Sequence, residues 1–296
     1  MASSFTFSGH ESFPCRQFWL KKGYDFVASG HKFSDDDSIV RLGVGKNMVT
    51  SIQFWMRSFG LLSEGLELTE IAHFVFGPEG KDPFLEDTGT LWLLHYLLVS
   101  TGRATIYQFA FNEFRKQRIE FTREQFTNYL NRKCGENDYT ISLRTLRSDV
   151  DVLIRTYSRP ADRGANPEDD FSSLLIDIDL IQRMTRSKAD GGTVYRIESK
   201  DRITIPTEVI LFAILQQNDG QSISFSRLMA DPNNMGNVFA LNRDGLQRHA
   251  ELIAQKFPQV IFTDDAGIKE IQFSKRPDPY TVLDHYYRNA QVFSLN

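Results

Sequence analysis

The stretch from Arg41 to Gly60, RLGVGKNMVTSIQFWMRSFG, constrains the fold of this chain more than any other. After the two glycines, apolar residues recur at spacings of three and four, the pattern of one buried helix face. These residues are Met48, Ile52, Trp55, Met56 and Phe59. Gly60 follows them and suits the position just beyond a helix end. The stretch predicts a helix entered through a glycine turn from a shorter helix, as in a helix-turn-helix.

The same glycines raise the alternative of a phosphate-binding loop, whose pattern is G-x-x-x-x-G-K-[ST]. Gly45 and Lys46 match that pattern, but Val40 stands in place of the first glycine and Asn47 in place of the hydroxyl residue. The preceding residues SDDDSIVRLG also indicate a capped helical turn rather than a buried strand. The sequence therefore favours the helix-turn-helix over an ATPase.

The other face of the predicted helix is polar and basic. It carries Lys46, Asn47, Thr50, Gln53 and Arg57, types that hydrogen-bond phosphates and base edges. The continuation LLSEGLELTEIAHFVFG predicts a tight turn, a short strand and another helix, which is how a winged helix continues. We expect this face to bind double-stranded DNA, with Asn47 and Gln53 as base contacts. The alternative is a helical hairpin with a polar outer face, because many helix-turn-helix units contact only proteins.

A second unit of the same kind follows. Thr122 and Gln125 form a capping box that starts a helix, and CGEND (134 to 138) ends it. The next segment, ISLRTLRSDVDVLIRTY, has an apolar stripe and resembles the recognition helix of DeoR-type bacterial repressors. Ser148 replaces the second arginine of that pattern. Arg144, Thr145 and Arg147 are the predicted DNA contacts here. The apolar stripe is predicted to comprise Leu143, Leu146, Val150, Leu153, Ile154 and Tyr157.

The C-terminal part predicts three helices, in PTEVILFAILQQ, SISFSRLMAD and NRDGLQRHAELIAQKF, followed by a hairpin in QVIFTDDAGIKEIQF. The fold class predicted for the whole chain is mainly α (α+β), with multiple winged-helix or helix-turn-helix-like units and short β hairpins. We expect four regions: residues 1–80, the N-terminal segment and first unit; 81–165, helical with the second unit; 166–205, a linker with a small β element; and 206–296, the C-terminal winged-helix-like domain.

Charge and cysteine usage narrow the class of protein. A net charge of −4 argues against a protein that coats DNA indiscriminately, yet residues 38–63 contain three cations and no acidic residue. The longest apolar run, TLWLLHYLLV, is about half of what a bilayer span needs. Cys15 and Cys134 lie far apart, which favours free thiols in a reducing cytosol. We expect a cytoplasmic protein without a membrane partner.

Two segments carry groups that could support catalysis. Asp82, Glu86 and Asp87 precede an apolar helix and are predicted as ligands of Mg²⁺, which prefers oxygen. Glu86 and Asp87 could instead simply favour the helix N-terminus electrostatically. His10 and Glu11 are the predicted catalytic residues, as a base and a ligand, in the segment SGHESFPCRQFWLKKG. For His10 the alternative is a histidine whose hydrogen bonds are satisfied in the core.

Four blocks together resemble one known family: GHESFPCRQFWLKKG, LGVGKNMVTSIQFWMRSFGLL, DPFLEDTGTLWLLHYLL and PEDDFSSLL. They are similar to the SspB-like bacterial family, formerly described only as a domain of unknown function, of Ssp DNA phosphorothioation systems. The resemblance implies phage defence beside a cysteine desulfurase, an ATPase and a sulfur-activating enzyme. It also implies DNA nicking with a divalent metal, Mg²⁺. The alternative function is a non-catalytic DNA-binding adaptor that positions the modification enzymes.

Overall fold

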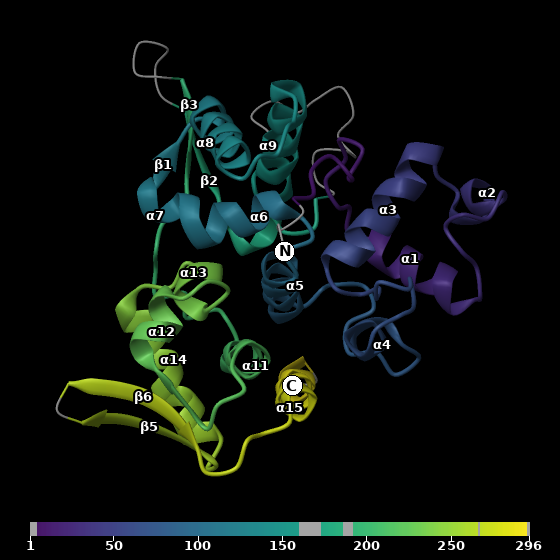
Figure 1. Cartoon of the computed structure of the whole chain (residues 1–296). Coiled ribbons are helices and arrows are strands. Elements are labelled where there is room, and N and C mark those ends of the chain that lie inside the picture. Colours follow the sequence, from purple (N-terminus) through teal and green to yellow (C-terminus); the bar gives the residue numbers. More distant parts are fainter. Residues whose placement is uncertain (1–4, 160–172, 186–191, 266, 295–296) are drawn as a thin grey trace. The chain divides into compact units, whose positions relative to one another are not determined.

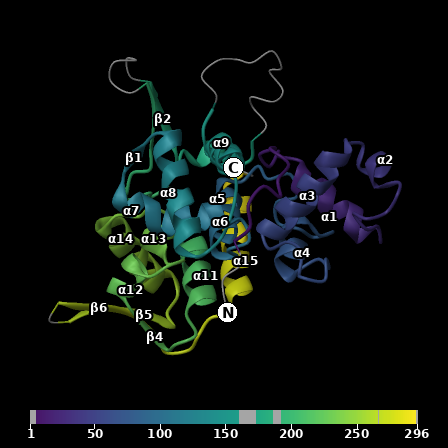
Figure 2. The same ribbon diagram turned by 45° about the horizontal axis from the view of Figure 1, so that its top comes forward.

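The computed structural model describes residues 5–159, 173–185, 192–265 and 267–294. The chain is mainly helical, with two small antiparallel sheets among the described residues, so the predicted α+β class is confirmed. Contacts divide the chain into two compact units, residues 1–197 and 198–296. Figures 1 and 2 show the elements of each unit. The four-region division remains a prediction.

The first unit begins with four helices that pack together: α1 (Trp19–Ala28), α2 (Ser38–Leu42), α3 (Lys46–Ser58) and α4 (Glu70–Phe76). As predicted, α3 starts after the glycine turn, and Ile52, Trp55 and Met56 are buried. Gly43 has a φ of 61°, a left-handed conformation that glycine adopts without strain. After α3, the predicted strand is reduced to a single β-bridge between Leu62 and Leu68 around a tight turn.

Helix α5 (Thr88–Ser100) lies at the centre of the first unit. It is apolar on all sides and almost wholly buried, which explains why its sequence lacks a polar stripe. The chain continues through α6 (Thr105–Phe109), one π-helical turn (Ala110–Phe114) and α7 (Arg115–Gln117). The aromatic rings of this segment pack against those of the following helices, with Phe114 stacked on Phe126.

Helices α8 (Arg123–Glu136) and α9 (Leu143–Tyr157) pack side by side, and the predicted capping box of Thr122 and Gln125 is confirmed. Leu143 was predicted in the buried stripe of α9 but is 44% exposed, because it is the first helical residue and lies beyond the packed turns. Strands β1 (Glu120–Phe121), β2 (Gln182–Thr185) and β3 (Thr193–Arg196) form a sheet in the order β1-β3-β2. Strands β2 and β3 lie within the region 166–205, and a short 3-10 turn (Ile176–Ile178) precedes them.

The second unit contains the predicted helices and hairpin. Its elements are α11 (Thr207–Gln217), β4 (Ser222–Ser224), α12 (Phe225–Ala230), α13 (Met235–Val238), α14 (Arg243–Lys256), β5 (Val260–Asp265), β6 (Ile268–Phe273) and α15 (Pro279–Ser294). The second predicted helix begins at Phe225, three residues after the predicted start at Ser222, because Ser222–Ser224 pair with β6 and Ser224 caps α12. The sheet order is β4-β6-β5, all antiparallel.

Both cysteines are free, as predicted, and both are buried. Within the described part of the chain, no helix combines the length and the apolar character needed to cross a membrane.

Candidate nucleic-acid interface

The polar face of α3 is open to solvent over its first two turns. Lys46, Asn47 and Thr50 are exposed, and Gln53 is half-buried. The ammonium group of Lys46 makes no ion pair with any residue that the structure describes. The predicted contact residues at this end of the helix are therefore accessible to a ligand.

Arg57, at the other end of α3, has a different environment. Its guanidinium donates to Glu64 Oε2 at 3.2 Å. The second oxygen of Glu64 pairs with Arg103, which precedes α6. Glu64 lies in the turn that follows α3, so the first predicted unit supplies its own carboxylate to the predicted phosphate contact. Arg57 is thus the one member of this predicted set that already holds an anion.

The first turn of α9 presents the second predicted set. Ser142 caps the helix by accepting from the Thr145 N–H at 3.1 Å, and the two hydroxyls lie 2.8 Å apart. Arg144 and Arg147 are exposed, and neither forms an ion pair within the described ranges. A capped helix start beside two guanidiniums that form no ion pair favours an anionic partner, although Glu124 and Asp151 line the same pocket as Arg147.

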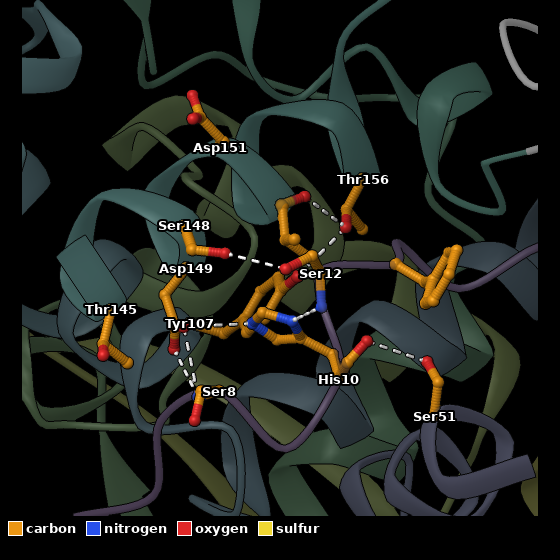
Figure 3. A network of polar contacts seen from close by, with 12 residues as sticks. Ser8, His10, Ser12, Ser51, Tyr107, Thr145, Ser148, Asp149, Asp151 and Thr156 are labelled. Carbon is orange, nitrogen blue, oxygen red and sulfur yellow. Dashed lines mark hydrogen bonds and ion pairs between the residues drawn. The ribbon is translucent and has the colours of Figure 1, made fainter. Parts of the chain in front are cut away.

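The loop from Ser8 to Ser12 lies between α3 and α9 and makes polar contacts with both (Figure 3). On one side, the Ser51 hydroxyl of α3 donates to the His10 carbonyl at 3.0 Å. On the other, the Ser12 and Ser148 hydroxyls lie 3.1 Å apart, and the Arg155 guanidinium donates to the Ser12 carbonyl at 2.7 Å. The two predicted DNA-contact helices therefore share one loop, although they lie far apart in the sequence.

His10 and Asp149 form a buried pair at the centre of that loop. His10 Nε2 lies 3.2 Å from Asp149 Oδ1, and both side chains are 2% exposed. The Ser12 N–H donates to His10 Nδ1 at 3.2 Å, so the proton of the neutral ring is on Nε2, facing the carboxylate. Nε2 is not well aligned for a hydrogen bond to any acceptor among the described residues, so the 3.2 Å contact with Asp149 is less directed than a regular hydrogen bond.

Asp149 also holds the backbone of the loop. Both of its oxygens accept from the Ser8 N–H, at 3.1 and 3.0 Å. The loop is strained, since Ser8, Glu11 and Ser12 have φ values of 59°, 49° and 65°. The buried His10–Asp149 pair therefore holds a conformation that non-glycine residues rarely adopt.

The geometry gives His10 and Glu11 different surroundings. The His10 ring is stacked on Trp55, and its Nδ1 lone pair already accepts a backbone hydrogen bond. Glu11 is exposed on the outside of the loop. This arrangement matches the core-histidine alternative more directly than a base open to substrate, and the catalytic roles of both residues remain predictions.

The three predicted metal ligands lie close together in the sequence, but their side chains make different contacts in the structure. Asp82 is buried and accepts from the N–H groups of Glu86 and Asp87 at 2.9 and 3.0 Å. Asp87 caps α5 by accepting from the Thr90 N–H at 3.0 Å, and Glu86 is exposed. In the part of the chain that the structure describes, no three His, Cys, Asp or Glu side chains are grouped to hold a metal ion.

Three residues of this region were missed at the sequence level. Asp149 follows Leu146 by three positions, so it falls on the buried side of α9. A lone acid there signals a buried partner. The contact between Glu64 and Arg103 has no comparable signal in the sequence, because it depends on how α3, the turn after it and α6 pack together.

A family model described as a protein of unknown function (DUF4007) matches residues 7–287. The chain belongs to this family. No curated protein matches this chain.

Two solved structures are similar to this DUF4007 chain over most of its length. One is described as an SspB crystal structure, with 27% identity, a TM-score of 0.84, and coverage of 96% of this chain and 88% of that chain. The other is described as a magnesium ion-bound SspB crystal structure, with 26% identity, a TM-score of 0.81 and the same coverage. The resemblance to the SspB-like family that the sequence predicted is confirmed.

One of the similar structures holds Mg²⁺, so the predicted oxygen ligands Asp82, Glu86 and Asp87 can be compared with what that metal needs. Mg²⁺ needs oxygen ligands near octahedral positions and keeps several of its waters. Both Asp82 oxygens and Asp87 Oδ1 accept from backbone N–H groups instead, and no metal-binding group of the described residues includes Glu86. The predicted ligands do not fit a magnesium site in this arrangement, and no catalytic step follows from them.

Proposed function

We propose that this chain binds double-stranded DNA as a component of an Ssp DNA phosphorothioation and phage-defence system. The proposed contact is the α3–α9 surface, defined by Lys46, Asn47, Thr50, Gln53, Arg57, Arg144, Thr145 and Arg147. The observation that carries the proposal is the loop from Ser8 to Ser12, which links both helices by hydroxyl hydrogen bonds. One loop therefore contacts both helices and links the two predicted DNA-contact sets.

Charge supports the same surface. Lys46, Arg144 and Arg147 are exposed and form no ion pair inside the described ranges, whereas exposed cations such as Arg41 and Arg132 are paired with acids one turn away. A cation that forms no ion pair can neutralise a phosphate without first losing a partner. Arg147 does share a pocket lining with Glu124 and Asp151, but it forms no ion pair with either within the described ranges. The overall charge of −4 then directs DNA to this surface rather than to the whole protein.

The test is the salt dependence of binding to a duplex, measured by fluorescence anisotropy. Each phosphate contact contributes about 0.9 to the slope of log affinity against log salt. Replacing Lys46, Arg144 and Arg147 with alanine together should flatten the slope by about 2.7. The matched control replaces Arg227, Arg248 and Arg288, which form ion pairs in the second unit. Equal slopes for both triple variants would remove the α3–α9 surface from the proposal.

The second unit has the order helix, strand, helices, then hairpin, and β4 pairs with β6. We infer that it is winged-helix-like and that it contacts other Ssp proteins rather than DNA. The polar groups of α14 support this role, because Arg248 pairs with Asp201 and Gln247 bonds Glu251 and Lys269. Co-elution with the purified cysteine desulfurase, ATPase or sulfur-activating enzyme tests it. If a variant that lacks residues 1–197 no longer forms these complexes, the contact lies in the first unit instead.

Mg²⁺-dependent nicking is the finer proposal, and it rests on the family resemblance and on the magnesium-bound neighbour. The non-catalytic adaptor stays as the second candidate, because no metal-ligand group forms among the residues described. Supercoiled plasmid incubated with the purified protein in Mg²⁺ or EDTA separates the two. Nicking predicts open circles in Mg²⁺ only. Unchanged plasmid in Mg²⁺ and in Mn²⁺, with DNA binding intact, would favour the adaptor.

A further inference from the structure

A pocket of about 220 Å³ opens in the first unit beside the C-terminal half of α3. Its lining combines two guanidiniums, hydroxyl groups, an amide and one aromatic ring. The lining residues are Thr6, Gly9, Thr50, Gln53, Phe54, Arg57, Ser58 and Arg103. Drug-sized ligands occupy pockets of roughly 300–1,000 Å³, so this one suits a smaller group such as one phosphate with an attached ring.

Two like charges share this pocket. The pKa of Arg103 is lowered, first by burial and then by the positive charge of Arg57. Both guanidiniums are partly shielded from water, with side-chain exposures of 35% for Arg57 and 29% for Arg103. Two arginines held together in this way repel one another unless an anion lies between them.

Glu64 supplies that anion in the present arrangement. One of its oxygens contacts Arg57 and the other contacts Arg103, but its side chain is 80% exposed. A carboxylate so exposed is weakly held, because water screens exposed ion pairs and holding two long side chains in place costs entropy. It sits on a turn that other groups maintain, including the Glu67 N–H, which donates to the Ser63 hydroxyl. Glu64 can therefore leave without unfolding the turn.

The pocket also has polar atoms that are not yet used. Arg57 Nε and the Ser58 hydroxyl are buried and have no hydrogen-bond partner among the described residues. A buried donor without a partner destabilises the protein, and a ligand oxygen that accepts from it removes that cost. These two unpartnered atoms belong to residues that line the pocket, an observation independent of its charges.

Phe54 gives the pocket an apolar wall. A Cβ placed on Gly9 would lie 2.4 Å from the Phe54 ring, so glycine lets this ring lie against the loop. The Phe54 ring also packs edge-on to His10 and Trp55, which limits its movement. A fixed aromatic face beside two arginines is a surface on which a nucleobase can stack while its phosphate is held.

We propose that this pocket binds a single nucleotide of a DNA strand, with its phosphate between Arg57 and Arg103 and its base against Phe54. Glu64 occupies the phosphate position in the absence of ligand and is displaced by it. The proposal rests on the proposed DNA-binding function for its source of nucleotide. Because the ligand chemistry is that of any nucleotide, a free nucleotide is the other source that the test distinguishes.

The test uses the full chain and two substitutions with opposite expected effects. Glu64→Gln removes the competing charge and should tighten binding of single-stranded DNA about threefold, since it abolishes an exposed ion-pair competitor. Arg103→Gln removes one charged phosphate donor and should weaken binding about tenfold or more. In the double variant, the gain from Glu64→Gln should disappear. The measurement is anisotropy of a labelled single strand and of the same sequence as a duplex.

Matched controls separate a pocket effect from a change in net charge. Glu136→Gln and Arg132→Gln make the same charge changes in an exposed pair on α8. Equal effects of Glu64→Gln and Glu136→Gln would overturn the pocket. Thermal shifts with inorganic phosphate, deoxyadenosine and dAMP identify the ligand. We expect the largest shift with dAMP, and its loss in Arg103→Gln.

The outcomes also separate this pocket from the proposed function. Stabilisation by dAMP that depends on Arg103, without DNA binding by the wild type, would assign the pocket to a free nucleotide and overturn the DNA source. DNA binding that depends on Lys46, Arg144 and Arg147 but is unchanged by both pocket substitutions would leave the proposed function standing and overturn the pocket. Circular dichroism of each variant checks that the chain is folded.

Discussion

At the scale of single residues, the His10–Asp149 pair has the largest structural consequence. Both side chains are buried, and removing one partner leaves the other charge or dipole without compensation. The same carboxylate accepts the Ser8 N–H, so its loss also frees a strained backbone segment. The pair therefore couples local stability to the geometry of the α3–α9 surface.

Replacing Asp149 with alanine is expected to lower the free energy of unfolding by about 3 kcal/mol, the usual cost of breaking a buried pair. His10→Ala and the double variant complete a cycle, in which we expect a coupling energy of about 1–3 kcal/mol. Urea denaturation measures all three. Asp151→Ala is the control, since Asp151 pairs with Arg123 at the surface and should cost less than about 1 kcal/mol. A coupling energy near zero would contradict the proposed pairing.

His249 in α14 gives the second residue-scale prediction. It is buried, and burial lowers its pKa; the positive charges of Arg248 and Lys256 lower it further, while the Arg202 carbonyl and Asp201 oppose the shift. Below the unfolded pKa of about 6.5, the unfolded chain binds a proton that the native chain does not. The contribution of His249 to stability is therefore present above that pH and is lost as pH falls towards the folded pKa.

The measurement is urea denaturation at pH 7.5 and pH 5.5 of the wild type and of His249→Gln, in which the amide keeps a donor for the Arg202 carbonyl. We expect the wild type to lose more of its free energy of unfolding on acidification than the variant. Equal losses in the two proteins would show that His249 does not titrate between these values.

At the scale of elements, caps and apolar stripes made the helices predictable. The capping box at Thr122 and the stripe of α3 depend on residues within a few positions of each other, so the sequence displays them directly. This prediction fails at Leu143. The three-and-four spacing places Leu143 on the apolar face, but the spacing cannot show that the first turn of α9 lies beyond the packed part of the helix. Strand β4 was assigned to a helix because its pairing with β6 is set by residues about fifty positions away.

The candidate site was predictable only in part for the same reason. Lys46, Asn47 and Arg144 are exposed as their positions on amphipathic helices indicate. The loop that joins α3 to α9 depends on a contact between Ser8 and Asp149, which are 141 residues apart. No local pattern encodes such a pair. Arg57 was predicted from its helical phase, which does not register that Glu64 folds back onto it.

The N-cap of α5 allows a test that separates a structural role of Asp87 from a metal-binding role. Asp87→Asn keeps a side-chain oxygen for the Thr90 N–H, whereas Asp87→Ala removes it and should cost about 1 kcal/mol of unfolding free energy. If Asp87 is only a cap, Asp87→Asn should retain both stability and any Mg²⁺-dependent nicking. Loss of nicking in a stable Asp87→Asn variant would restore Asp87 as a metal ligand. Thr122→Ala on α8 is the control for a lost cap elsewhere.

At the scale of the whole molecule, the proposal places the DNA contact in the first unit, at the α3–α9 surface, and the rival is a contact through the second unit. The two cysteines distinguish them, because Cys15 and Cys134 both belong to the first unit and are buried. Burial raises the pKa of both thiols, so the reactive thiolate is scarce in the native state. Thiol labelling therefore reports opening of the first unit alone.

We predict that duplex DNA slows labelling of these thiols by a disulfide reagent. A ligand that binds only the closed state lowers the open population by a factor of 1 + [L]/Kd, which is about elevenfold at a free DNA concentration of ten times Kd. The Lys46, Arg144 and Arg147 triple variant should lose this protection at the same DNA concentration. If DNA binds through the second unit instead, the thiol rate should stay constant while hydrogen exchange of residues 243–256 slows. That outcome would move the interface to α14 and overturn the α3–α9 surface.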